Sequence, residues 1–183
     1  MPHRKECVKR ERENQESAMG SQLCYDEKEG VQDMQYWQIG IGDGEVDMVE
    51  IFLKLNVALV GPGKGGDFFD NRATYENMKD GHLIRKFAED IQIGDILVLK
   101  HIENPQSKTW RIYAVGEVVS PYRYEPIFDC VDKSGWDVQH CRRVQWKIPS
   151  EDTTVVMGGA PIRLQRLDDD NPMKLKAVEI LHE

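Results

Sequence analysis

The stretch VGPGKGGD at residues 60–67, here called the glycine loop, has the glycine content of a phosphate-binding loop and ends the apolar run VALV at 57–60. A Walker A loop needs Lys followed by Ser or Thr after its last glycine, because the lysine reaches the terminal phosphates and the hydroxyl holds magnesium. Here the last glycine, Gly66, is followed by Asp67. A carboxylate at that position would repel phosphate, so a Walker A site is excluded.

Gly61, Gly63 and Gly66 also satisfy the G-x-G-x-x-G pattern of dinucleotide-binding loops. That pattern must open a helix within a βαβ unit, but residues 67–72 are acidic and lack helical periodicity, and the chain has no repeated βαβ pattern. Two interpretations remain. The glycine loop is a plain surface connection, or its small residues let the backbone approach a ligand closely and cover a pocket, with Lys64 at a phosphate.

No set of residues indicates catalysis or a metal site. Ser120, Ser134 and the histidines stand at no spacing typical of a nucleophile, a base and an orienting residue. A zinc site built from Cys130, His140 and Cys141 is disfavoured, because adjacent residues of a strand point to opposite faces. We therefore expect a protein that is not an enzyme and that uses no metal or cofactor.

Composition favours one domain with a charged surface. The chain has 183 residues, of which 40% are hydrophobic and 31% charged, and a net charge of -8, which argues against coating nucleic acid through charge alone. Residues 108–147 are locally basic, with seven Lys and Arg against five Asp and Glu. No apolar run approaches the roughly 20 residues of a membrane span, and the N-terminus lacks the apolar stretch of a signal peptide. We expect a cytoplasmic protein without a membrane partner, whose scattered cysteines are free thiols.

The chain divides into a charged N-terminal tail or helix at 1–34, a barrel domain at 35–149, and a C-terminal extension with a terminal helix at 150–183. Hydrophobic patterning predicts several short strands and few helices. The strands are expected at 36–41, 57–60, 110–119 and 137–148, with a tight turn that leads into a buried strand at 91–99 and a short strand or turn at 161–164. The helices are expected at 45–55, 83–88 and 172–181. Within the strand at 110–119, Gly116 suggests a bulge or bend. This order predicts an α+β fold with a small, twisted, mostly antiparallel β-barrel flanked by short helices.

Three stretches in this order carry a resemblance to a known group of domains. They are YWQIG at 36–40, IGDILV at 93–98 followed by IYAVGEV at 112–118, and HCRRVQW at 140–146. Over residues 35–149 the chain resembles a PUA-like domain of the EVE and YTH kind. That group includes the specificity domains of modification-dependent restriction systems, so the resemblance extends the expected function to defence or to recognition of modified RNA or DNA.

The resemblance implies a twisted barrel whose pocket holds a single nucleobase, often methylated and flipped out of its strand. Stacking on aromatic walls is worth about 1–3 kcal/mol per base, which offsets the few kcal/mol needed to flip it. The implied partner is DNA or RNA carrying a modified base, together with a separate effector protein such as a nuclease, because the chain contains no nuclease or ATPase module.

Residue by residue, the resemblance places two sets of side chains. The expected nucleobase pocket comprises Trp37, Gly61, Phe68, Phe69, Tyr122, Tyr124 and His140. The expected backbone contacts are Lys64, Arg123, Arg142 and Arg143. Each set has a structural alternative. The aromatic residues of the strands could fill the interior of the barrel, and His140 could form hydrogen bonds with buried polar groups. The arginines could form ion pairs at the surface.

Two other functions remain open. In the first, the barrel is a scaffold for protein interaction or regulation, and the charged termini do the binding. In the second, the chain is a small nucleoside hydrolase, because related ASCH-type barrels include such enzymes. The absence of a clear Lys–Glu catalytic pair argues against the hydrolase.

Overall fold

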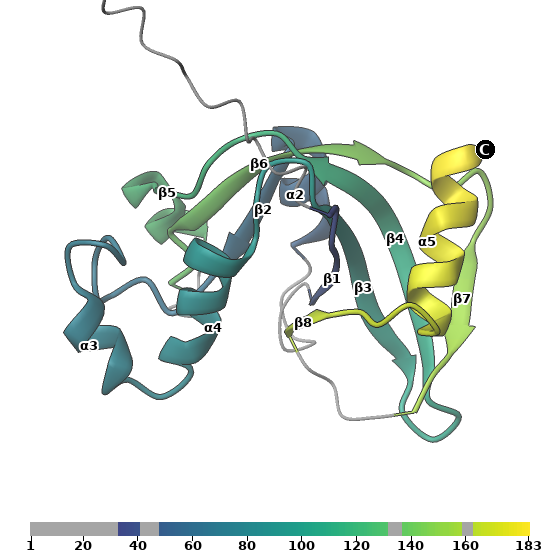
Figure 1. Ribbon diagram of the computed structural model, residues 1–183, viewed down its shortest axis with the longest axis horizontal. Helices are drawn as coiled ribbons and strands as arrows, with labels where there is room; N and C mark the ends of the chain where they lie inside the picture. Colours follow the sequence, from purple (N-terminus) through teal and green to yellow (C-terminus); the bar gives the residue numbers. More distant parts are fainter. Residues whose placement is uncertain (1–32, 41–47, 132–136, 159–162) are drawn as a thin grey trace, which may run out of the picture. The chain divides into compact units, whose positions relative to one another are not determined.

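The computed structural model describes residues 33–40, 48–131, 137–158 and 163–183, and Met34–Glu183 form one compact unit. The expected tail at 1–34 lies almost wholly outside the described residues. The compact unit is an α+β fold in which a curled, mixed sheet forms a half-barrel with a few short helices (Figure 1). Among the described residues, no helix has the length and apolar character needed to cross a membrane.

The sheet has the strand order β2-β6-β4-β3-β1-β8, with β5 paired to β6 and β7 paired to β4. Only β1 and β3 run parallel among the described pairs, so the expected mostly antiparallel arrangement is confirmed. The strands are β1 (Tyr36–Gly40), β2 (Val57–Val60), β3 (Ile96–Asn104), β4 (Thr109–Val118), β5 (Arg123–Tyr124), β6 (His140–Lys147), β7 (Thr153–Val156) and β8 (Leu164–Arg166).

The helices are short, and the C-terminal one begins with a side-chain cap. The C-terminal helix follows the prediction: Pro172 takes its first position, and the Asn171 side chain accepts a hydrogen bond of 2.9 Å from the Met173 N–H, as a helix cap does. The helical segments are α2 (Val49–Leu55), α3 (Arg72–Glu76), α4 (Gly81–Arg85), a π-helix (Lys86–Asp90), a 3₁₀-helix (Pro126–Val131) and α5 (Pro172–His182).

The curl of the sheet comes from β4. One edge of this strand pairs with β3 along its length. Its other edge pairs with β7 over Thr109–Ile112 and with β6 over Val115–Val118. Since β6 and β7 follow one another in the chain and share this edge, the sheet bends between them.

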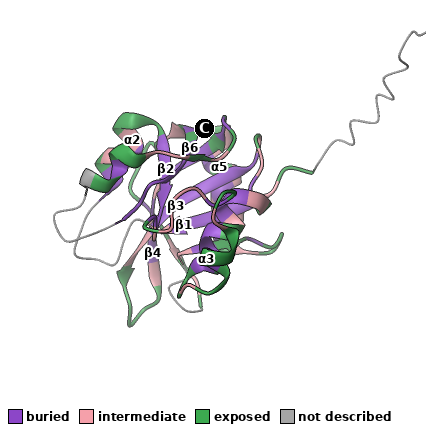
Figure 2. Ribbon diagram, turned by 90° about the vertical axis from the view of Figure 1, so that its left-hand side faces the viewer, coloured by how far each residue is buried: buried purple, intermediate pink, exposed green. Residues whose placement is uncertain are grey.

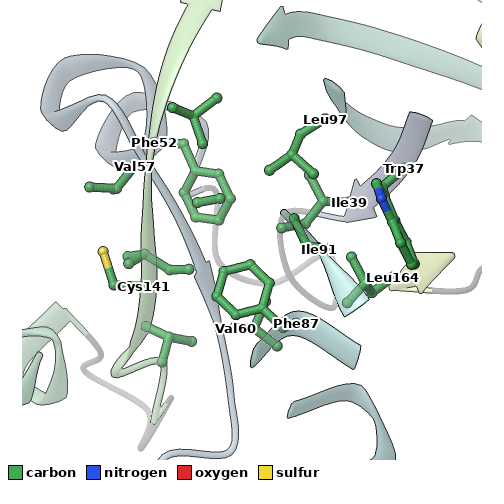
Figure 3. Packing of buried hydrophobic residues seen from close by; sticks show 14 of the residues in the cluster. Trp37, Ile39, Phe52, Val57, Val60, Phe87, Ile91, Leu97, Cys141 and Leu164 are labelled. Atoms are coloured by element: carbon green, nitrogen blue, oxygen red, sulfur yellow. The ribbon is translucent and has the colours of Figure 1, made fainter. Parts of the chain in front are cut away.

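Alternation along β3 divides the core into two clusters on opposite faces of the sheet. Leu97 and Leu99 belong to the larger cluster with residues of α2, α4 and the π-helix, whereas Ile96 and Val98 pack with α5. Figure 1 shows α5 lying along β4 and β7, and Figure 2 shows the buried residues concentrated in the strands. Figure 3 shows part of the larger cluster, including Phe52, Phe87 and Leu97.

Three local predictions differ from the structure. Gly116 forms no bulge, because it pairs regularly with Leu97 and Trp146; a Cβ there would lie 2.6 Å from the Trp146 ring, so the glycine makes room for the indole. The register shifts of this strand pair lie near Leu99 and Ile102 instead. The polar stretch after the glycine loop contains α3. The residues after 149, expected as an extension, contribute β7 and β8 to the sheet.

Candidate functional site

His140 begins β6 at the point where three strands meet. It pairs with Val60 at the end of β2 and with Tyr124 in β5, so the glycine loop that leaves β2 passes directly beside its ring. The imidazole is fully buried. The rings of Tyr122 and Tyr124 lie 5.7 and 5.6 Å from it, so these two tyrosines share a face, as their spacing predicts.

The hydrogen bonds around His140 determine its tautomer. The Tyr75 hydroxyl donates to the Gly66 carbonyl at 2.7 Å and must therefore accept from Nε2 of His140, which lies 2.9 Å away. Nε2 also lies 3.0 Å from the Pro62 carbonyl, which can only accept. The proton is thus on Nε2. On the other side of the ring, the Tyr122 hydroxyl donates to Nδ1 at 2.7 Å.

These groups are neutral near pH 7. Burial lowers the pKa of His140 to about 4, and burial raises the pKa of Tyr75 and Tyr122 above its ordinary value. All hydrogen-bonding atoms of the imidazole are used within the protein. His140 therefore anchors the surrounding loop, which is the structural alternative to its expected role as a reader of the base edge.

The glycine loop is fixed by side chains that bind its backbone. The Tyr124 hydroxyl donates to the Gly63 carbonyl at 3.0 Å, and the Lys64 N–H donates to Asp137 Oδ2 at 2.6 Å. A Cβ at Gly61 would lie 1.9 Å from the main-chain oxygen of Asp137. The absence of side chains in the glycine loop thus lets its backbone pack closely against the rest of the protein. Neither the surface-connection nor the ligand-cover interpretation predicts this packing.

A pocket of about 200 Å³ opens beside this anchored loop. Its walls come from the segment just after the glycine loop, the π-helix and the turn after it, the segment after β4, and β6. We call it the Arg142 pocket, lined by Phe69, Ala88, Gln92, Ile93, Pro121, Tyr122 and Arg142.

Aromatic and aliphatic side chains form the mouth of the Arg142 pocket. The rings of Phe69 and Tyr122 meet edge to face at 5.5 Å. Phe69 is 50% exposed and Ile93 60% exposed. The guanidinium group of Arg72 lies 5.3 Å from the Phe69 ring and forms an ion pair with Glu89 at 2.5 Å, so the exposed ring is held in place by a cation–π contact.

Arg142 lies at the inner end of this site and is 3% exposed. Its Nε and one terminal nitrogen donate to the carbonyls of Phe87 and Ala88 at 2.9 and 3.0 Å, and the other terminal nitrogen donates to the Ser120 carbonyl at 3.3 Å. These carbonyls include those near the end of the π-helix, where a cation is favoured. Burial lowers the pKa of Arg142 to about 10, which leaves it charged at neutral pH.

The charge of Arg142 has no carboxylate within ion-pair distance in the described part of the chain. A guanidinium group carries five N–H bonds, and three donate to the carbonyls named above. The two other N–H bonds have no acceptor among the described residues. A buried cation with unused donors beside a pocket is a site for a group rich in acceptor oxygen.

The predicted pocket residues separate into three groups. Phe69 and Tyr122 line the Arg142 pocket, whereas Gly61 is part of the glycine loop, and Tyr124 and His140 bind that loop beside the pocket. Phe68 is buried in the core, and its N–H donates to the Tyr122 hydroxyl at 3.0 Å. Trp37 does not line the pocket: it is 5% exposed, and its Nε1–H donates to Asp95 Oδ2 at 3.0 Å.

The four expected backbone contacts occupy different environments. Lys64, Arg123 and Arg143 are exposed; Arg123 lies 3.9 Å from Glu125, and Arg143 donates to the Leu55 carbonyl at 2.8 Å. Arg142 faces the interior instead, because alternation along β6 turns it opposite to Arg143. Its side chain therefore lines the Arg142 pocket and is not exposed at the surface.

Sequence reasoning missed several residues at this site. Tyr75 is the buried residue of α3 and connects that helix to His140; an isolated tyrosine in a polar stretch was the available signal. Ala88, Gln92, Ile93 and Pro121 reach the pocket only through the tertiary arrangement of the π-helix and two turns. Among the described residues, no cluster of three or more His, Cys, Asp or Glu side chains is arranged to hold a metal ion.

The fold and site define a class of α+β proteins in which a half-barrel sheet supports an aromatic pocket with a buried arginine. Residues 37–165 match the domain of unknown function DUF8426, so the chain belongs to this family. The match includes every residue that lines the Arg142 pocket and all of the glycine loop. No curated protein shows a significant match to the chain.

Proposed function

We propose that the protein is a nucleic-acid-binding module that receives one nucleobase of DNA or RNA, modified and turned out of its strand, in the Arg142 pocket. The observation that carries this proposal is the combination of Phe69 and Tyr122 at the mouth with the buried Arg142 behind them. Aromatic faces bind any base by stacking, and a buried donor group reads its edge. The proposal agrees with the PUA-like resemblance of the sequence.

The size of the pocket favours a single ring system. Pockets that enclose drug-sized ligands measure roughly 300–1,000 Å³, whereas the Arg142 pocket measures about 200 Å³. A base would enter it, while its sugar and phosphate would stay outside. Ala88, Ile93 and Pro121 offer apolar surface, and burying one methyl group there is worth about 0.8 kcal/mol, which is roughly a fourfold preference for a methylated base.

The charge of the protein limits how the rest of the strand is held. With a net charge of -8, affinity must come from the base in the pocket more than from phosphate contacts. The exposed Lys64, Arg123 and Arg143 are the available contacts from the predicted set. We therefore expect weak binding with a shallow dependence on salt concentration.

The test is binding of short fluorescent DNA and RNA oligonucleotides, with and without methylated bases, across a salt series. Phe69→Ala removes a half-exposed stacking wall and should weaken binding by about tenfold, since stacking is worth about 1–3 kcal/mol per base. Leu175→Ala, at an exposed apolar residue of α5, is the matched control and should bind like the unmodified protein. The proposal fails if no oligonucleotide binds below about 100 μM at low salt, or if Phe69→Ala binds unchanged.

A further inference from the structure

We propose, resting on the function proposed above, that the Arg142 pocket selects a base whose edge carries a carbonyl oxygen beside a ring N–H, and disfavours adenine. Guanine, hypoxanthine, uracil and thymine present such an edge, whereas adenine has an amino group and no carbonyl. The selectivity comes from the two polar side chains of the pocket whose hydrogen-bonding capacity is not used up within the described structure, Arg142 and Gln92.

Arg142 supplies the donors in a fixed direction. Its guanidinium group is held by the carbonyls of Phe87, Ala88 and Ser120, so the two remaining N–H bonds cannot turn to follow a poorly matched ligand. The group is charged and buried without a carboxylate partner in the described ranges. Ligands that present an acceptor oxygen of high partial charge are therefore favoured. An amino group facing the guanidinium would be unfavourable, because both groups are hydrogen-bond donors.

Gln92 supplies the acceptor. Its side-chain Nε2–H donates to the Glu89 carbonyl at 2.6 Å, and its main-chain N–H donates to Asp95 Oδ2 at 3.0 Å. The first bond orients the side-chain amide and the second holds the backbone of the turn, while Oε1 receives no donor from the described residues. A ring N–H would satisfy that oxygen, whereas the unprotonated ring nitrogen at the corresponding position of adenine would not.

Hypoxanthine and adenine form the best matched pair of probes. The two purines have the same ring size and both stack on aromatic walls, but hypoxanthine carries a carbonyl and a ring N–H where adenine carries an amino group and a bare ring nitrogen. Cytosine does not discriminate, because its carbonyl suits Arg142 and its amino group suits Gln92.

The experiment measures binding of single-stranded oligonucleotides that are identical except for one central base, hypoxanthine or adenine. We expect hypoxanthine to bind at least about tenfold more tightly, because a site built to hydrogen-bond a ligand strongly rejects an analogue that leaves its polar groups unpaired. Gln92→Leu should reduce this ratio by about threefold or more while preserving the fold, since Gln92 is only half buried. Arg142 is not substituted here, because its loss would also remove three internal hydrogen bonds.

The outcomes separate the two proposals. Equal or tighter binding of adenine, with binding still weakened by Phe69→Ala, overturns the carbonyl selectivity and leaves the base pocket standing. Failure of both oligonucleotides to bind overturns both proposals. An unchanged preference for hypoxanthine in Gln92→Leu overturns the role assigned to Gln92.

Discussion

The Tyr122 hydroxyl donates a hydrogen bond of 2.7 Å to Nδ1 of His140 while the Tyr122 ring forms a wall of the Arg142 pocket. One side chain therefore connects the anchored glycine loop to the proposed ligand site. Because the same hydroxyl accepts from the Phe68 N–H, the segment that carries Phe69 is held by the same residue that Phe69 contacts across the mouth. The geometry of the pocket thus depends on the network around His140.

Tyr122→Phe keeps the ring and removes this hydroxyl. It leaves Nδ1 of His140 and the Phe68 N–H without their partner, so the free energy of unfolding should fall by about 1–3 kcal/mol. Tyr113→Phe is the control, because the Tyr113 hydroxyl forms no hydrogen bond with the described residues while its ring is similarly half-buried. Urea denaturation of the two variants measures the difference. Equal loss in both would show that the hydroxyl of Tyr122 contributes nothing specific.

His140 should make the protein sensitive to mild acid. Its pKa is about 4 in the folded protein and near 6.5 in the unfolded chain, so between these values the unfolded state binds a proton that the folded state does not. Stability is therefore complete above about pH 6.5 and falls as the pH decreases toward 4, by roughly 3 kcal/mol in all. Denaturant unfolding at several pH values between about 7.5 and 4 measures this slope.

The control for this pH dependence is another histidine. His140→Gln should unfold at a lower denaturant concentration than the unmodified protein. It should also lose the decrease in stability below about pH 6.5 that protonation of His140 causes in the unmodified protein. His82→Gln removes an exposed imidazole of α4 and should retain the slope of the unmodified protein. Equal slopes in all three proteins would contradict the assignment of a neutral, buried His140.

Several of the strands were predictable because their signal is local. The apolar run of β2, and the alternation of β4 and β6, specify buried faces without any knowledge of the partners. The helix α3 could not be predicted from its polar sequence, because it buries only Tyr75 and depends on the contact of that residue with His140. The short strand β7 is equally dependent on context, because it exists by pairing with β4.

The site was predictable only in part, for a similar reason. Tyr122 and Phe69 stood out as aromatic residues in loops, but Trp37 is also aromatic and serves as a hydrogen-bonded core residue. Whether an arginine of β6 points inward depends on the groups that it binds, and two of the three carbonyls that hold Arg142 lie more than fifty residues away in the chain. Sequence spacing cannot reveal such a contact.

Substitution of Gly61 should test the close packing of the glycine loop. An added Cβ would lie 1.9 Å from the Asp137 main-chain oxygen, which side-chain rotation cannot relieve, so Gly61→Ala should lower stability by about 1–3 kcal/mol. A Cβ at Gly158 would meet nothing within 4 Å, which makes Gly158→Ala the control with little effect. Thermal unfolding compares them. A neutral Gly61→Ala would mean that the loop does not pack against the main chain at Asp137.

Arg142 and Arg143 are adjacent but should respond differently to the same substitution. Arg142→Lys loses the planar group that reaches three carbonyls at once and should cost about 3 kcal/mol, because a buried ammonium cannot replace these bonds. Arg143→Lys, at an exposed residue with one bond to the Leu55 carbonyl, should change stability by less than about 0.5 kcal/mol. Chemical denaturation of both variants gives the comparison, and similar values for the two would contradict the inward orientation of Arg142.

Phe68 and Phe69 provide the sharpest separation of stability from binding. Phe68 is buried in the core, so Phe68→Ala should cost about 3–5 kcal/mol, whereas Phe69→Ala removes a half-exposed ring and should cost less than about 1 kcal/mol. If the Arg142 pocket stacks a base, Phe69→Ala nevertheless weakens oligonucleotide binding in a protein that remains folded. Circular dichroism melting and fluorescence anisotropy on the same samples measure the two effects. A Phe69→Ala protein that loses stability as severely as Phe68→Ala would assign this ring to the core and remove it from the proposed binding wall.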